Sequence, residues 1–286
     1  MHTPLRCDAK KRRWRVSGTS ANQLRESIMS GMLVGMNMLS TKGVLLVNQL
    51  RDLLFPPSCL FCHAPMPSGN GCCTLCLETI EVWPHSTCSR CGIPLPAEMH
   101  PGPCGRCLQK PPAQCHTCSL YCYHGAVRDA ILEWKLQGHD AAVRWLVNAA
   151  MPGIRSQINE GSLLLPVPMP ISRMRKSGQH HAANFCKWLA DDTGCTWDWH
   201  LLRRIGEQPR QSALSGQARR KNLRKAFALA DDYGSRWQDL AGQATSIWIV
   251  DDILTTGSTL HFAARASLKL GVPINVLSLA RTSQKH

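Results

Sequence analysis

The chain has 286 residues and a hydrophobic fraction of 44%, enough for one sizeable globular domain and a smaller one, which excludes a chain that is disordered throughout. Its 33 Lys and Arg residues outnumber 19 Asp and Glu residues, and the formal net charge of +14 predicts a surface that attracts polyanions. Polar residues interrupt the apolar stretch 31–50 and no signal-peptide pattern precedes it, so we expect neither a secretory signal nor stable membrane insertion.

Residues 1–53 differ in composition from the rest of the chain. They carry a basic cluster at 10–15, several methionines and a stretch with Ser and Asn. We expect a disordered extension, or translated sequence upstream of the true start, and a basic arm that contacts nucleic acid is the alternative. At the end of this region, Val44–Leu54 has apolar residues at helical spacing and predicts a short amphipathic helix before Pro56 and Pro57.

Residues 54–118 are rich in Cys, Gly and Pro and lack the periodic apolar residues of a hydrophobic core, so a metal is needed to hold them together. Two Cys-x-x-Cys pairs can supply four thiolates to one tetrahedral zinc ion. Four such pairs therefore predict a double zinc ribbon with one or two structural zinc ions. The predicted ligands, in chain order, are Cys59, Cys62, Cys73, Cys76, Cys88, Cys91, Cys104 and Cys107.

Three questions about these pairs stay open in the sequence. Sequential pairing is the simplest arrangement, but interleaved pairing, or one lost site, also fits the spacing. Cys72 beside Cys73 leaves the second pair ambiguous by one residue. A thiol–disulfide centre is the rival interpretation of a single pair, although four pairs in series favour zinc. Thiolates held by zinc suit a reducing compartment, which predicts a cytoplasmic protein.

Residues 119–286 alternate between helical and strand patterns, and short apolar runs are separated by amphipathic segments. Strands separated by helices predict an α/β fold with a mostly parallel sheet and helices on both faces. The predicted helices are 125–137, 182–190 and 258–270, and the predicted strands are 163–167, 246–250 and 274–279.

A basic stretch lies between the predicted helix 182–190 and the strand 246–250. A flexible loop of this kind can close over a reacting centre and bring cations to a departing pyrophosphate. It equally suits a single DNA strand, or a solvated charged surface with no ligand. The basic residues are Arg203, Arg204, Arg210, Arg219, Arg220, Lys221, Arg224 and Lys225.

The segment Ile247–Thr259 carries the most specific pattern in the chain. An apolar strand leads to Asp251 and Asp252, then to a small polar loop, and then to a helix. Ligands of open α/β sheets bind at the carboxyl ends of strands, where a loop and a helix N-terminus can bind a phosphate. The two carboxylates are placed to reach sugar hydroxyls, directly or through Mg²⁺. An ordinary turn with an N-cap is the plainer alternative.

This segment resembles the motif with which type I phosphoribosyltransferases bind 5-phosphoribosyl-1-pyrophosphate (PRPP). Further stretches resemble the ComF family of competence-associated, phosphoribosyltransferase-like proteins, and the resemblance covers residues 54–282. They are the four cysteine pairs; Tyr123 and Gly125 leading to Lys135 and Gly138; Leu165-Pro166-Val167-Pro168 followed by Arg173 and Arg175; and Arg204, Gln208, Gln211, Leu214, Arg219 and Asn222, ending in Ala226-Phe227.

The resemblance implies a type I phosphoribosyltransferase-like domain that binds PRPP with Mg²⁺. It implies catalytic roles for Asp251, Asp252, Arg173 and Arg175. The implied PRPP-binding residues are Val250, Asp251, Asp252, Thr255, Thr256, Gly257, Ser258 and Thr259. The implied nucleic-acid or pyrophosphate loop contains Arg204, Gln211, Arg219, Arg220, Asn222 and Arg224.

One stretch departs from the family pattern. After Arg175 the family usually has Arg-Gly-Phe-Asn-Gln, whereas this chain has Lys176-Ser-Gly-Gln-His-His181. The adjacent histidines leave two alternatives, donation to a pyrophosphate or simple exposure at a helix start. No residue stands out as a base for an incoming nucleophile.

Two functions follow from this resemblance, in DNA uptake during transformation or in DNA utilization. One is a phosphoribosyltransferase whose acceptor the sequence does not identify. The other is a single-stranded DNA-binding protein that keeps the PRPP-binding fold as a scaffold or sensor, without transfer. The expected partners are therefore PRPP, or a related phosphorylated ribose, and single-stranded DNA.

Overall fold

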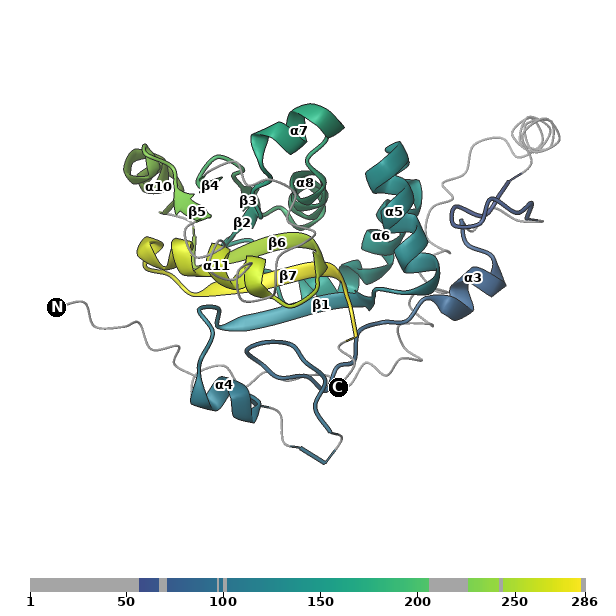
Figure 1. The fold of residues 1–286 in the computed structure, drawn as a ribbon, viewed down its shortest axis with the longest axis horizontal. Coiled ribbons are helices and arrows are strands. Elements are labelled where there is room, and N and C mark those ends of the chain that lie inside the picture. The colour runs from purple at the N-terminus through teal and green to yellow at the C-terminus, as the bar shows by residue number, and fades with distance from the viewer. Residues whose placement is uncertain are drawn as a thin grey trace, which may run out of the picture. The chain divides into compact units, whose positions relative to one another are not determined.

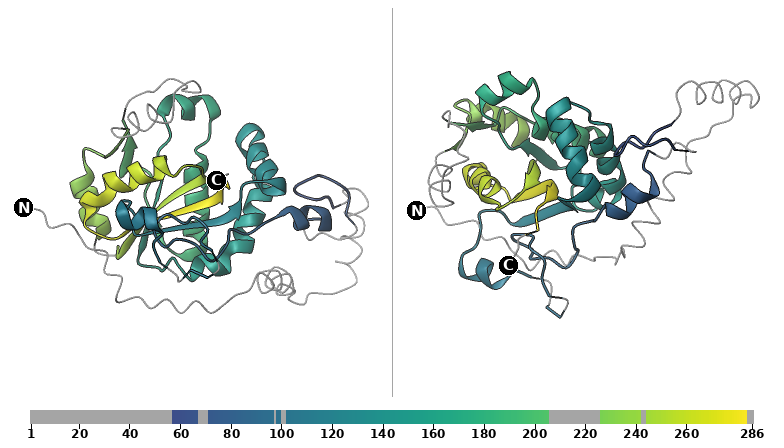
Figure 2. Two further views of the ribbon diagram at one scale, coloured as in Figure 1. Left: turned by 60° about the horizontal axis from the view of Figure 1, so that its bottom comes forward. Right: turned by 45° about the vertical axis from the view of Figure 1, so that its right-hand side comes forward.

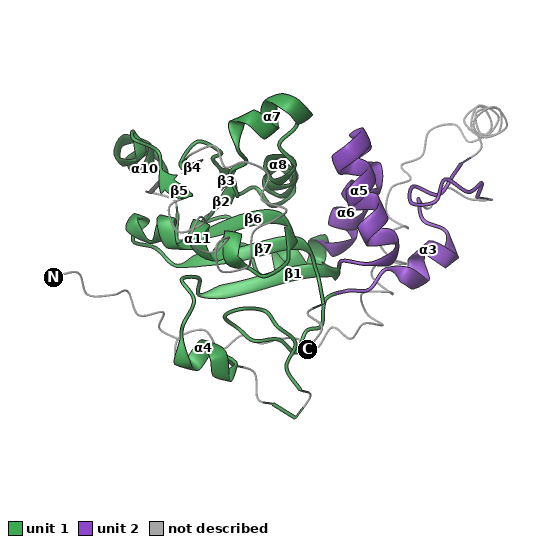
Figure 3. Ribbon diagram, viewed as in Figure 1, with its two compact units in different colours: residues 1–8, 83–122, 151–286 green, residues 9–82, 123–150 purple. Residues whose placement is uncertain are grey.

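The computed structural model describes residues 57–66, 71–96, 98–99, 102–205, 226–241 and 244–283. The extension 1–53, with its predicted amphipathic helix, and most of the basic stretch lie outside the described residues. The described chain forms two compact units (Figure 3). Unit 1 contains 83–122 and 151–283, and unit 2 contains 57–82 and 123–150. The predicted domain boundaries at 53 and 118 stay a prediction.

Five parallel strands form the sheet of unit 1, in the order β1-β7-β6-β2-β3 (Figure 1). The central strands β6 and β7 are apolar on both faces, as expected for a parallel sheet that is covered on both sides. The bounds are β1 His116–Cys122, β2 Ser162–Pro166, β3 Thr196–Trp197, β6 Ser246–Leu254 and β7 Ile274–Arg281.

Two helices cover the faces of this sheet (Figures 1 and 2). Helix α11 (Ser258–Ser267) connects β6 to β7, and α8 (His181–Thr193) connects β2 to β3. The two connections run in opposite directions along the sheet, so right-handed crossovers place the helices on opposite faces. Leu260 of α11 packs in one apolar cluster with Ile247 and Ile249, while α8 packs against β2 and β6. The predicted α/β fold class, with helices on both faces, is confirmed.

A small antiparallel hairpin lies between α8 and β6 in the chain. Strands β4 (Leu202–Arg204) and β5 (Phe227–Leu229) pair with each other, and α10 (Tyr233–Ala241) follows. Leu202 and Phe227 belong to the same apolar cluster as α11, which anchors the hairpin on that side of the sheet. The remaining elements of unit 1 are α4 (Gly105–Gln109), α7 (Ile171–Ser177) and the 3-10 turn η1 (Leu268–Leu270).

Unit 2 contains α3 (Thr74–Thr79), α5 (Gly125–Gln137) and the beginning of α6 (Ala141–Arg155). Helix α5 has the bounds predicted from the spacing of its apolar residues, and it ends at Gly138, whose φ of +84° favours glycine. Helix α3 packs against α5, and Ala126 N–H donates to Thr79 Oγ1 at 3.2 Å. Among the residues that the structure describes, no helix is long and apolar enough to cross a membrane.

The predicted strand 163–167 and the helices 182–190 and 258–270 correspond to β2, α8 and α11 with η1. Strand β1 was not predicted, because its Cys, Ser and Thr residues resemble the Cys-rich region before it. These polar side chains are accommodated inside the sheet: Ser119 of β1 and Ser278 of β7 form a buried hydrogen bond of 2.8 Å.

Candidate functional site

The carboxyl ends of β2 and β6 lie where the strand order of the sheet reverses direction. From β2 the chain moves to β3 on one side, and from β6 it moves to β7 on the other. Val167, directly after β2, donates its N–H to the carbonyl oxygen of Val250 in β6 at 2.8 Å, so the two strand ends are adjacent. Open α/β sheets bind ligands outside the carboxyl ends of strands at such a point. The polar segments after β2 and β6 are therefore the candidate site.

The two acidic residues lie within β6, which extends to Leu254 rather than ending at Val250 as predicted. Asp251 is in register with Ser278 of β7, and both carboxylates are half-buried. Asp252 N–H donates to Asp251 Oδ1 at 3.0 Å, and Ile253 N–H donates to Asp252 Oδ1 at 2.7 Å. These local hydrogen bonds hold the two carboxylates at the strand end that faces the candidate site.

The loop after β6 leads directly into the N-terminus of α11. Gly257 is the N-cap, has a φ of +75° that favours glycine, and makes no side-chain capping bond. Within the loop, Ser258 N–H donates to Thr256 Oγ1 at 3.4 Å, and the two hydroxyls lie 3.1 Å apart. The first N–H groups of a helix have no partner inside the helix and favour an anion. The segment Thr255–Thr259 can therefore bind a phosphate, with Thr255 and Thr256 exposed.

Two other elements of unit 1, α7 and β4, carry the predicted basic residues of the site. Arg173 and Arg175 lie on α7, which buries none of its residues, and both are exposed. Arg204 at the end of β4 is half-buried, and its guanidinium carbon lies 5.4 Å from the centre of the Phe227 ring. Burial lowers the pKa of Arg204, the nearby charge of Arg173 lowers it further, and Asp251 opposes this shift. Arg204 is therefore the basic residue that interacts electrostatically with both Arg173 and Asp251.

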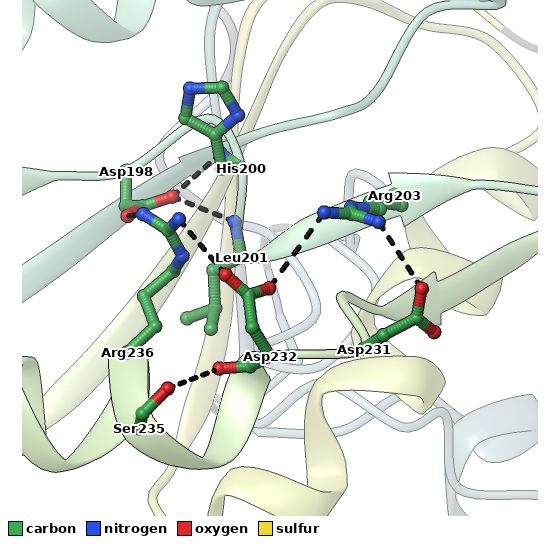
Figure 4. A network of polar contacts seen from close by, with 8 residues as sticks. All are labelled: Asp198, His200, Leu201, Arg203, Asp231, Asp232, Ser235 and Arg236. Carbon is green, nitrogen blue, oxygen red and sulfur yellow. Dashed lines mark hydrogen bonds and ion pairs between the residues drawn. The ribbon is translucent and has the colours of Figure 1, made fainter.

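The neighbouring arginine, Arg203, has a different role because successive residues of a strand face opposite sides. Its Nη1 lies 3.4 Å from Asp231 Oδ2, and its Nη2 lies 3.8 Å from Asp232 Oδ1 (Figure 4). Arg236 joins this network through Asp232 and Asp198, each at 3.2 Å, and its hydrogen bond lowers the pKa of Asp232. The network fixes the base of the hairpin that carries Arg204.

The adjacent histidines are not both exposed at the helix start. His181 is buried, and His180 is half-buried as the N-cap of α8. Backbone N–H groups point at both ring nitrogens of His180, from Ala183 to Nδ1 at 3.1 Å and from Met169 to Nε2 at 3.3 Å. Burial lowers the pKa of His180 despite the charge of Asp252. A neutral imidazole accepts at only one nitrogen, and the N–H of Ala183 is the closer donor, so His180 fits a structural role as a helix cap better than donation to a pyrophosphate.

The eight paired cysteines form two quartets in sequential order. The first quartet is Cys59, Cys62, Cys73 and Cys76 in unit 2, and the second is Cys88, Cys91, Cys104 and Cys107 in unit 1. In each quartet the sulfur atoms lie within 4.8 Å of one another. Tetrahedral zinc with bonds of about 2.3 Å separates its sulfur ligands by about 3.8 Å. The separations are 3.7 Å from Cys62 to Cys73 and 3.8 Å from Cys91 to Cys104. Sequential pairing is confirmed.

Backbone N–H groups in both quartets favour the thiolate form that zinc requires. Burial opposes ionisation of Cys59, but the N–H groups of Cys73, Cys62 and Phe61 lower its pKa to about 6. The same balance lowers the pKa of Cys88 to about 7, and Cys104 N–H donates to its sulfur at 3.1 Å. The sulfur of Cys73, and not that of Cys72, belongs to the first quartet, so Cys73 is the ligand. Such closed four-sulfur sites supply structure and no open coordination position.

The remaining predicted residues divide into two groups. Val250 is fully buried, and its carbonyl oxygen accepts the hydrogen bond from Val167, so it shapes the site from within the sheet. Gln211, Arg219, Arg220, Asn222 and Arg224 lie outside the described residues. Arg281 was not predicted, although an arginine that ends an apolar strand run was a visible signal; it is 3% exposed and contacts the second quartet.

Solved structures of adenine phosphoribosyltransferase are among those that match part of this chain. One matches 52% of the chain, and 75% of its own length, at 13% identity with a TM-score of 0.29. At this TM-score, the similarity carries no conclusion about the chemistry of the site.

Sequence relatives show the family of this chain. Residues 50–108 match the double zinc ribbon domain family. The DNA utilization protein YhgH of Salmonella typhimurium is 30% identical over 238 residues, covering 80% of this chain and 99% of that protein. Competence protein F of Haemophilus influenzae is 27% identical over 233 residues, covering 78% and 96%. The chain belongs to the ComF family, to which the DNA utilization protein YhgH and competence protein F also belong.

Proposed function

We propose that the chain binds PRPP with Mg²⁺ at the carboxyl ends of β2 and β6, and that it acts in the cytoplasm in DNA uptake or utilization. The observation that carries this proposal is the combination of two fixed carboxylates and an uncapped helix N-terminus at the reversal of strand order. A DNA-related role is supported by the printed names of the relatives, and by the net charge of +14.

Each part of the site suits one part of PRPP. The segment Thr255–Thr259 would bind the 5′-phosphate through backbone N–H groups and hydroxyls. Asp251 and Asp252 would bind the ribose hydroxyls, and they are the residues that would hold Mg²⁺ together with phosphate oxygens. Arg173 and Arg175 on exposed α7 would bind the pyrophosphate. Bound Mg²⁺ would neutralise part of the pyrophosphate charge.

As an enzyme, the protein would catalyse displacement at the anomeric carbon of the ribose. The bond from this carbon to the pyrophosphate oxygen breaks, a bond to the acceptor forms, and the acceptor releases a proton. Charge accumulates on the departing pyrophosphate, where Arg173 and Arg204 would stabilise it. His180 is held against backbone donors, so we expect an acceptor that is already nucleophilic rather than one activated by this ring.

The test is calorimetric titration of PRPP with Mg²⁺ into the zinc-loaded wild type and into an Asp251→Asn/Asp252→Asn variant. The matched control is Asp191→Asn/Asp192→Asn, because it changes an adjacent acidic pair on the exposed surface of α8. Hydrogen bonds to charged groups contribute about 1.5–3 kcal/mol each, so the variant that changes two carboxylates of β6 should bind roughly a hundredfold to ten-thousandfold more weakly or not at all.

The control should bind as the wild type does. Absence of binding to the folded, zinc-loaded wild type would contradict the proposed ligand. Equal losses in both double variants would mean that net charge, rather than the two carboxylates of β6, determines affinity.

Binding of single-stranded DNA without transfer is the second candidate. It is favoured by α7, which buries no residue and presents Arg173, Arg175 and Lys176 on its surface. An Arg175→Ala/Lys176→Ala variant should bind a labelled oligothymidine more weakly and with a smaller salt dependence, as measured by fluorescence anisotropy. Arg265→Ala/Lys269→Ala, at exposed positions of α11 and η1, is the control. If oligothymidine binds both variants and the wild type equally, α7 is not the DNA surface.

A further inference from the structure

Arg281 is a buried cation in unit 1 that the proposed site does not use. It is the last residue of β7 and is 3% exposed. Its Nη1 donates to the carbonyl oxygen of Cys91 at 2.6 Å, and its guanidinium carbon lies 5.2 Å from the centre of the Trp83 ring. Burial lowers the pKa of Arg281, and the groups that oppose this shift are the thiols of Cys91 and Cys88. Among the described residues, no carboxylate forms an ion pair with it.

A buried guanidinium is costly unless a negative charge lies nearby. Four thiolates around one Zn²⁺ carry more negative charge than the metal neutralises, so a loaded quartet is an anion. The hydrogen bond to the Cys91 carbonyl oxygen places Arg281 beside a ligand residue of the second quartet. The loaded quartet therefore supplies the negative charge that this arginine otherwise lacks.

The main chain of Arg281 lies opposite the residue that directly precedes the candidate phosphate loop. Arg281 is in register with Leu254 of β6, and Thr282 N–H donates to the carbonyl oxygen of Leu254 at 3.1 Å. Leu254 is buried and directly precedes Thr255, the first residue of the loop. Arg281 thus contacts a ligand residue of the second quartet with its side chain, and it lies opposite Leu254, the last residue of β6 before the loop.

The ribbon around the second quartet is closely attached to the sheet edge. Trp83 N–H donates to Leu120 of β1 at 2.9 Å, and Trp83 Nε1 donates to Gly92 at 2.9 Å. Thr117 of β1 donates its hydroxyl to the carbonyl oxygen of Arg90 at 2.7 Å. This attachment leaves little freedom for Arg281 to move independently of the quartet.

We propose that Arg281 is the counter-cation of zinc in the second quartet and a positioning residue that couples occupancy of this quartet to the order of the loop 255–259. In this proposal the second quartet helps to order the phosphate-binding loop without contacting the ligand. The proposal concerns metal retention and loop order, so it does not depend on PRPP being the ligand.

The test uses full-length protein that carries Cys62→Ser. This substitution removes a ligand of the first quartet, so that the zinc released in the experiment comes from the second quartet. Arg281→Met removes the charge and keeps the length, Arg281→Lys keeps the charge, and Arg265→Met is an exposed-arginine control. Loss of an outer-shell partner weakens metal binding roughly tenfold to a hundredfold. We expect release to a chromophoric chelator to accelerate by that factor in Arg281→Met, by less in Arg281→Lys, and not in Arg265→Met.

Two results would overturn the counter-cation role: unchanged release in Arg281→Met, or equal acceleration in Arg281→Met and Arg281→Lys. The coupling is tested in the Cys62→Ser protein with Arg281 intact, so it remains testable if Arg281→Met does not fold. Hydrogen exchange of the amides 254–259 should rise when the chelator removes zinc and return when zinc is restored. Exchange there that does not respond to zinc would overturn the coupling, whatever PRPP does.

Discussion

The two cysteine quartets share one spacing pattern but lie in different surroundings. In the first quartet Cys59 is buried and Cys62 is exposed, whereas three of the four cysteines in the second quartet are buried. The first quartet is joined to helices of unit 2: Phe61 meets Trp145 of α6 edge to face at 5.5 Å, and His63 lies 3.2 Å from Glu133 of α5. The second quartet is joined to the sheet of unit 1 by backbone hydrogen bonds and a buried arginine.

One zinc motif therefore has two different structural environments and two different structural roles in the same chain. Exposed ion pairs, a ring contact and the hydrogen bond from Ala126 N–H to Thr79 Oγ1 attach the first ribbon to helices of unit 2, so its loss should leave the sheet of unit 1 intact. The second ribbon bonds to the backbone of the edge strand β1, so its loss should be felt throughout unit 1. The following changes test whether the two quartets differ in this way.

The largest difference is expected between Cys91→Ser and Cys62→Ser. Each variant should lose one zinc ion per chain, measured by elemental analysis. Structural zinc contributes about 10–16 kcal/mol in zinc-finger peptides, which is comparable to the about 5–15 kcal/mol that stabilises a whole domain. Cys91→Ser should therefore lower the melting temperature of unit 1 sharply, and Cys62→Ser should leave it unchanged. Equal melting behaviour of the two variants would remove the distinction between the quartets.

Glycine substitutions should give an intermediate effect. Gly92 and Gly71 have φ angles of +67° and +78°, where an L-residue costs about 1–2 kcal/mol. A Cβ at Gly92 would lie 3.0 Å from the backbone oxygen of Thr117, which cannot move easily, and this adds about 1–3 kcal/mol. A Cβ at Gly71 would lie 2.9 Å from Cδ1 of Trp145, but relief there needs a side chain to shift rather than the backbone of a sheet strand.

We therefore expect Gly92→Ala to lower the free energy of unfolding more than Gly71→Ala, by urea denaturation. Gly105→Ala is the control, because its Cβ would meet no atom within 4 Å. If Gly71→Ala lowers the free energy of unfolding as much as Gly92→Ala does, contact with the backbone does not distinguish the second ribbon from the first.

The smallest effect is expected for Glu133→Gln beside the first quartet. Glu133 accepts from His139 Nδ1 at 2.8 Å, and this bond, with the charge of His63, holds its pKa below the usual range. Both histidines are largely exposed, and such ion pairs contribute about 0–1 kcal/mol. The free energy of unfolding should change by no more than this, and the difference should shrink in high salt. A larger loss would mean that the first ribbon depends on this carboxylate after all.

The strand–acid–loop–helix segment and the cysteine pairs could be predicted because each is specified by neighbouring residues. The end of the loop at Gly257 and the start of α11 at Ser258 follow from local backbone requirements. The strand pattern, by contrast, ended too early at Val250, since the pairing of Asp251 and Leu254 with β7 depends on a distant strand.

The roles of individual charged residues could not be predicted from the amino-acid sequence. Arg203 and Arg204 are adjacent and identical, yet one pairs with Asp231 and Asp232 and the other faces Arg173 and Asp251. The burial of His181 and Arg281 was missed for the same reason, because tertiary contacts decide it. These residues acquire their environments only when elements far apart in the chain pack together.

The strand order has a consequence for how the protein is made. Strand β7 lies between β1 and β6, and His116 near the second quartet pairs with Asn275. While the ribosome is still adding the residues before Ile274, β1 has no sheet to join and Arg281 does not yet exist. The contacts that join the second ribbon to the sheet through β1 and Arg281 are therefore completed only when nearly the whole of unit 1 has been synthesised.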